Sequence, residues 1–219
     1  MKLLAVRLAR SIWLIPSYFL NPKGLYLLPA IASLKDRYSF MKSPLDRPIP
    51  PPPNEGYKYE NGAFKGKNGV VQIVSLTTHN DGVVIDTRSS TDDADLFMED
   101  LMAWANKEYG LPSLSELPAK RLHVSELNVA FENAPKFLNQ KLASFFDEVT
   151  SAISNKSKGK AEFLGFQLGT DQALSDKPAI FRIDREVNAP IGENRYYSFA
   201  PTSTAAHLKL LEKLEKLAI

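Results

Sequence analysis

Three stretches of the chain carry apolar residues at the spacing of an amphipathic helix. The first opens on the capping sequence Ser90-Thr91-Asp92-Asp93 and ends before Gly110, and its apolar positions are Ala94, Phe97, Met98, Leu101, Trp104 and Ala105. The second begins at Pro135 and carries Leu138, Leu142, Phe145, Val149 and Ile153. The third covers Ser203–Leu217, with a leucine seam at Leu208, Leu211, Leu214 and Leu217 or Ala218. The pattern predicts three helices.

Other stretches have the composition and alternation of strands. Val70–Thr77 and Val83–Thr87 are rich in β-branched residues, and Asp81-Gly82 between them predicts a hairpin. Three further strands are predicted over residues 121–131, 162–168 and 179–187. In the first of these the apolar positions change phase, which predicts a bulge near Ser125–Glu126. No repeat of fixed period is visible.

This order of elements predicts an α+β fold. We expect a mixed, mainly antiparallel sheet with helices packed on one face, because strands joined by short turns alternate with single helices. The fold would be preceded by an extended N-terminal arm.

The arm is predicted from the first 55 residues, which are apolar and basic. They contain no acidic residue before Asp36, and Pro16, Pro22 and Pro29 interrupt their apolar runs. A membrane-spanning helix needs roughly 20 apolar residues, so we expect no transmembrane helix here. Pro44, Pro48 and the run Pro50–Pro53 predict a semi-rigid polyproline spacer. We therefore expect two parts, an arm with its spacer at residues 1–55 and an α+β domain at residues 56–219.

Several roles for the arm are open at this point. A secretory signal or a mitochondrial-type presequence would share its basic, acid-free character. A retained arm would instead bury its apolar side chains on a neighbouring subunit, on a membrane surface or on its own domain. Pro16 inside the apolar centre, with no clear small-x-small cleavage site after it, argues against a secretory signal.

Composition and charge narrow the class of protein. The chain has 219 residues, of which 44% are hydrophobic and 24% charged, and no cysteine. Disulfides, cysteine-ligated metals and thiol nucleophiles are thereby excluded. A net charge of +2 does not favour nucleic acid as a partner. Nothing in the sequence indicates a cofactor, and the compartment stays open, either soluble or bound in an assembly.

Acidic residues near the predicted hairpin form the strongest candidate for catalysis. Asp86, Asp92 and Asp93 could together hold Mg²⁺, which prefers oxygen ligands. However, helix capping and the helix dipole already account for Asp92 and Asp93. The three histidines lack metal-ligand spacing, and no phosphate-binding loop or nucleophile elbow is present.

The sequence favours a non-enzymatic structural or assembly subunit of a larger complex, such as a virion-like particle. The arm would pack on a neighbouring chain or on a second copy, together with the last helix. The predicted contact residues are Trp13, Tyr18, Phe19, Leu25, Tyr26, Leu208, Leu211 and Leu214. Two alternatives are a metal-dependent hydrolase or phosphotransfer enzyme using the aspartates, and a peripheral membrane protein anchored by the arm.

Overall fold

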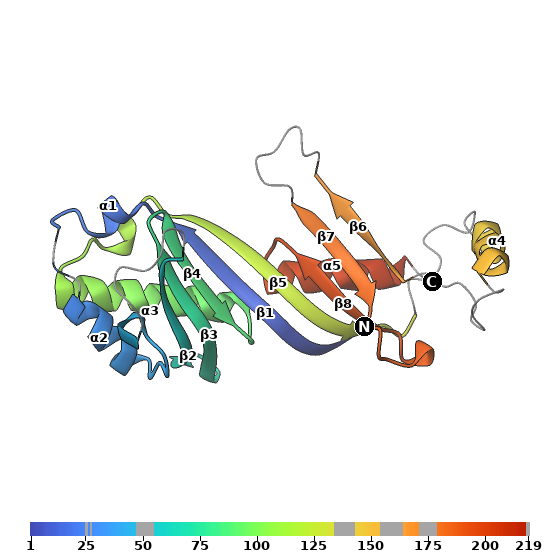
Figure 1. Ribbon diagram of the computed structural model, residues 1–219, viewed down its shortest axis with the longest axis horizontal. Coiled ribbons are helices and arrows are strands. Elements are labelled where there is room, and N and C mark those ends of the chain that lie inside the picture. The colour runs from blue at the N-terminus through green and yellow to red at the C-terminus, as the bar shows by residue number, and fades with distance from the viewer. Residues whose placement is uncertain are drawn as a thin grey trace. The chain divides into compact units, whose positions relative to one another are not determined.

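The fold is an antiparallel sheet with helices, which confirms the α+β class. The computed structural model describes residues 1–24, 26, 28–46, 55–133, 143–153, 164–170 and 179–217. The elements in chain order are β1 (Lys2–Leu14), α1 (Ser17–Leu20), α2 (Leu28–Arg37), β2 (Tyr57–Gly66), β3 (Gly69–His79), β4 (Gly82–Thr87), α3 (Thr91–Tyr109), β5 (Lys120–Ala130), α4 (Ala143–Ile153), β6 (Gly165–Gly169), β7 (Ile180–Arg185), β8 (Arg195–Ala200) and α5 (Thr204–Lys216) (Figure 1). The strand order is β2-β3-β4-β1-β5-β8-β7-β6.

The chain groups into two compact units. The N-terminal unit comprises residues 6–126 and 201–205, and the C-terminal unit comprises residues 1–5, 127–200 and 206–219. This grouping does not follow the predicted division at residue 55. The predicted polyproline spacer at residues 47–54 lies outside the described residues.

In the N-terminal unit, α2 and α3 pack against one hydrophobic core. Its members from the sheet are Trp13, Ile15, Tyr59, Ile73, Leu76, Val83 and Ile85, and α3 contributes Ala94, Phe97, Met98, Leu101 and Met102. Ile31 and Leu34 of α2 pack against the same cluster. Ser90 caps α3 by accepting a hydrogen bond from the Asp93 N–H at 3.0 Å, as its sequence predicts. Gly110 ends the helix at φ 63°, a left-handed conformation that glycine adopts without steric cost.

The start of the chain is a strand inside the sheet rather than a separate arm. β1 pairs antiparallel with β4, with Ser11 opposite Ile85 and Trp13 opposite Val83, and β5 is its other neighbour. Ala9, Trp13 and Ile15 are fully buried on the helix side. Val6, Leu8 and Ile12 on the opposite side are half-buried. A strand with apolar residues on both faces has no polar alternation, which is why these residues resemble an arm in the sequence.

β5 runs from Lys120 to Ala130, and the bulge predicted near Ser125–Glu126 in its middle stays a prediction. Arg121 and His123 contact α3, and Ser125 and Leu127 are buried at the next alternate positions. The helix-facing side of β5 therefore begins with polar residues and continues with an apolar one.

In the C-terminal unit, α5 packs on the strands through its buried side. Ile183, Tyr196 and Ala200 of the strands and Leu211 of α5 are fully buried or nearly so. The Met1 amine forms an ion pair with Glu215 of α5, whose other carboxylate oxygen accepts the Glu132 N–H at 2.8 Å. The second predicted helix is described from Ala143 to Ile153, and its predicted start at Pro135 lies outside the described residues.

Candidate functional site

The predicted contact residues of the first segment fall into two groups. Trp13 is fully buried beneath α3, so it is not available to a partner, and its assignment to partner binding is corrected. Tyr18 and Phe19 on α1 are 67% and 37% exposed, and Tyr26 is 77% exposed. Leu25 lies outside the described residues.

The predicted leucine seam of the last helix faces the protein's own interior. Leu211 is fully buried, Leu214 is 9% exposed and Leu208 is half-buried. Burial by the C-terminal unit itself corrects the expectation that Leu211 and Leu214 contact another chain. Leu217, which the sequence placed on the same side, follows α5 and is 74% exposed. Periodicity alone does not show whether the protein itself or another chain covers an apolar helix side.

Asp86, the first metal candidate, is engaged in an ion pair. Arg10 donates from Nε to Asp86 Oδ1 at 2.6 Å and from Nη2 to Oδ2 at 2.9 Å, while Ser75 Oγ donates to Oδ2 at 3.0 Å. The hydrogen bond to Asp86 raises the pKa of the Arg10 guanidinium. Both carboxylate oxygens of Asp86 therefore already have cationic or hydroxyl donors.

Asp92 and Asp93 lie at the start of α3. Asp92 is exposed, and Asp93 accepts the Ser90 hydroxyl at 2.9 Å in the helix cap. Within the described part of the chain, no group of three or more His, Cys, Asp or Glu residues is placed to hold a metal ion.

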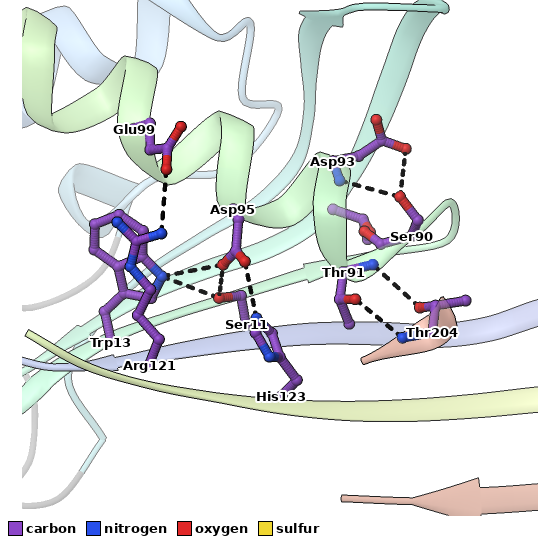
Figure 2. A network of polar contacts seen from close by, with 11 residues as sticks. Ser11, Trp13, Ser90, Thr91, Asp93, Asp95, Glu99, Arg121, His123 and Thr204 are labelled. Carbon is purple, nitrogen blue, oxygen red and sulfur yellow. Dashed lines mark hydrogen bonds and ion pairs between the residues drawn. The ribbon is translucent and has the colours of Figure 1, made fainter. Parts of the chain in front are cut away.

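Asp95 is the centre of a polar network between α3 and the strands, which the sequence did not indicate (Figure 2). Its Oδ1 accepts the Ser11 hydroxyl at 2.5 Å and the Trp13 indole N–H at 3.2 Å. Its Oδ2 lies 2.9 Å from His123 Nε2. Asp95 follows Thr91 and Ala94 on the buried side of α3, and this polar residue at a core-facing position was the available signal.

The geometry of this network supports a structural role rather than nucleophilic catalysis. A catalytic serine needs an adjacent base that removes its proton, usually a histidine placed between serine and carboxylate. Here the carboxylate lies between Ser11 and His123 instead, and Ser11 is fully buried. The network therefore joins α3 to β1 and β5.

Arg121 extends the same contact between β5 and α3. Its guanidinium lies 4.1 Å from the centroid of the Trp13 ring, and it donates to Glu99 at 3.1 Å (Figure 2). A cation over an indole face is favourable electrostatically. Arg121 thus covers the edge of the core that Trp13 fills.

A second serine–histidine pair lies inside the C-terminal unit. Ser198 Oγ and His207 Nε2 are 2.8 Å apart, and both side chains are fully buried. Ser198 donates its only hydroxyl proton to the Arg182 carbonyl at 3.0 Å, so His207 Nε2 must be the donor to Ser198. A serine that accepts a hydrogen bond from a histidine does not give its proton to that histidine, so it is not activated as a nucleophile. The pair instead connects α5 to β8.

An open groove lies beside Phe19. It has a volume of about 460 Å³ and is lined by Phe19, Asn21, Pro22, Lys23, Asn106, Gly110, Leu111, Pro112 and Glu116. We call the exposed rings of Tyr18, Phe19 and Tyr26, which are close in the sequence, the aromatic surface. The rings of Tyr18 and Phe19 lie in contact, with centroids 4.5 Å apart and an angle of 35° between their planes. The aromatic surface and the groove are the candidate functional site, because they are accessible. The polar groups around Asp95 and the Ser198–His207 pair are instead bonded to one another inside the protein.

Comparison with known proteins finds no match. No family model matches the chain, and neither does any curated protein or solved structure.

Among the residues that the structure describes, no helix is both long enough and apolar enough to cross a membrane.

Proposed function

We propose that this protein is a non-enzymatic binding subunit, which contacts another protein chain through the aromatic surface and the adjoining groove. The observation that carries the proposal is the exposure of Tyr18, Phe19 and Tyr26 within nine residues of chain. Aromatic side chains are enriched at protein interfaces, where they supply most of the binding energy. Their exposure here contrasts with the buried aromatic residues of the core.

The chemistry of the groove favours a protein partner over a membrane. Its lining combines apolar residues with Asn21 and Asn106, and it holds one cation, Lys23, and one anion, Glu116. An anionic lipid surface is bound by clusters of basic residues. A mixed lining with both signs of charge matches instead the polar rim and apolar centre of a protein interface.

The test compares a surface variant with a matched control. Tyr18→Ala/Tyr26→Ala removes two exposed aromatic rings, and Phe145→Ala removes another that is 54% exposed on α4. Light scattering over a concentration series measures self-association, and affinity measurement with partners identified from the native source measures binding to other chains. We expect the double variant to lose about 30-fold or more in affinity, as for an interface hot spot, and Phe145→Ala to bind normally.

Two outcomes would contradict the proposal. One is a partner that binds the double variant and Phe145→Ala equally well. The other is flotation with anionic liposomes that depends on Tyr18 and Tyr26, which would assign the aromatic surface to a membrane instead.

A further inference from the structure

Two stretches of the chain follow the same order of elements. When the one-turn helix α1 and the short 3₁₀ helices are left out, the described elements of the first stretch are β1-α2-β2-β3-β4-α3 and those of the second are β5-α4-β6-β7-β8-α5. The sheet order is β2-β3-β4-β1 for the first and β6-β7-β8-β5 for the second. In both, three strands follow one another as hairpins and the first strand lies beside the last.

The two stretches also agree residue by residue where they are best defined. β4 and β8 have six residues each, and their starts, like the starts of α3 and α5, are 113 residues apart. At this spacing the buried positions coincide: Val83 with Tyr196, Ile85 with Ser198, Thr87 with Ala200, Ala94 with His207, Met98 with Leu211, and Leu101 with Leu214. β8 and α5 therefore repeat β4 and α3 in register.

Equivalent residues make equivalent hydrogen bonds at the helix starts. The Thr91 N–H donates to Thr204 Oγ1 at 3.1 Å, and the Thr204 N–H donates to Thr91 Oγ1 at 3.0 Å (Figure 2). The preceding residues, Ser90 and Ser203, are also identical. The agreement thus covers topology, burial and the start of the helix.

In the first stretch, the end of α2 covers one side of α3. Tyr38, which follows α2, packs on Phe97 with ring centroids 4.6 Å apart, and its hydroxyl donates to Asp100 at 2.6 Å. Arg37 forms an ion pair with Asp100 at 2.9 Å and lies 5.7 Å from the Trp104 ring centroid. The covered side of α3 is therefore Phe97, Asp100 and Trp104.

The equivalent side of α5 is apolar but exposed. Its residues, at the same 113-residue spacing, are Leu210, Lys213 and Leu217, which we call the α5 stripe. Leu210 is 46% exposed and Leu217 is 74% exposed, whereas Phe97 is fully buried. Leu217 is the first residue after α5, so the two exposed leucines lie about two helical turns apart.

α4 has the position in the chain and the apolar side that a helix covering the α5 stripe needs. It holds the place of α2 in the second stretch, and Phe145 on its apolar side is 54% exposed. The signs of the charges are exchanged. Lys213 stands where α3 has Asp100, and α4 carries the anion Glu148 in its middle, whereas α2 carries the cation Arg37 as its last residue. We propose that α4 packs on the α5 stripe, with Glu148 facing Lys213, as α2 packs on α3.

The cysteine-free chain allows a direct crosslinking test. Glu148→Cys/Lys213→Cys places two thiols across the proposed contact, and Glu148→Cys/Glu212→Cys turns one thiol by about 100° around α5, away from that contact. With a short bismaleimide and dilute full-length protein, we expect the first pair to crosslink within one chain at least about tenfold faster than the second, because packing raises the effective concentration. Equal rates would overturn the proposal. Crosslinks formed only between chains would also overturn it, since the α5 stripe would then bind a second copy.

A second measurement does not depend on introduced thiols. Leu210→Asp puts a charge into the stripe, and we expect hydrogen exchange of the α4 amides to speed up at least about tenfold as the helix loses its apolar contact. Lys209→Asp, on an exposed neighbouring position, is the matched control and should leave α4 unchanged. Unchanged α4 exchange in Leu210→Asp would count against packing.

Discussion

Asp95 shows at the scale of single residues how a carboxylate on a helix can belong to the interior. Local sequence explains it as an acid near the positive end of the α3 dipole. In the structure it accepts hydrogen bonds from the buried groups Ser11 and Trp13 and lies against His123. These partners come from two strands far apart in sequence. The core-facing position of Asp95 was therefore a local signal, but no local pattern could identify its partners.

Removing this carboxylate should destabilise the protein far more than removing a neighbouring one. We expect Asp95→Ala to lower the free energy of unfolding by about 2–4 kcal/mol, because the Ser11 hydroxyl and the Trp13 N–H lose a buried acceptor. Asp92→Ala, which removes an exposed acid from the same helix start, should cost at most about 1 kcal/mol. Urea unfolding at neutral pH measures both. Similar costs for the two variants would show that Asp95 does not hold α3 to the strands.

Among the elements, those with strong local signals were predictable from the sequence. The capped helix α3, the β3–β4 hairpin and α5 each have a turn or cap residue together with a regular apolar period. β1 could not be predicted, because a strand with two neighbours and apolar residues on both faces lacks the alternation that marks a strand. β2 was missed for the opposite reason, since its sequence is largely polar.

β1 is therefore expected to be essential for folding. Trp13→Ala should lower the free energy of unfolding by about 3–5 kcal/mol, the usual cost of truncating a buried aromatic residue. Tyr18→Ala, only five residues later but 67% exposed, should change it by less than about 0.5 kcal/mol. Chemical denaturation followed by circular dichroism measures the difference. A small effect of Trp13→Ala, together with a stable protein after deletion of residues 1–14, would restore the interpretation of this segment as a separate arm.

At the scale of the whole molecule, the repeated order of elements is hidden in the sequence. Within β4–α3 and β8–α5 at the 113-residue spacing, the identical pairs are Ser90 with Ser203, Thr91 with Thr204, Glu99 with Glu212, and Leu101 with Leu214. Equivalent positions are buried even where their residues differ, as for Ile85 and Ser198. A position can stay in the interior while the residue that fills it and its neighbours change. Similarity of this kind becomes visible only when strand order and burial are known.

The repeat predicts matching stability profiles for the two helices. Met98→Ala and Leu211→Ala, at equivalent fully buried positions, should each lower the free energy of unfolding by about 2–5 kcal/mol. Glu99→Ala and Glu212→Ala lie one residue further along and should each cost at most about 1 kcal/mol, since Glu99 loses only a surface ion pair and Glu212 is exposed. Urea titration of the four variants gives the profile. A register shifted by one residue would pair Met98 with Glu212. If Glu212→Ala lowered the free energy of unfolding strongly and Leu211→Ala did not, α5 would not repeat α3 in this register.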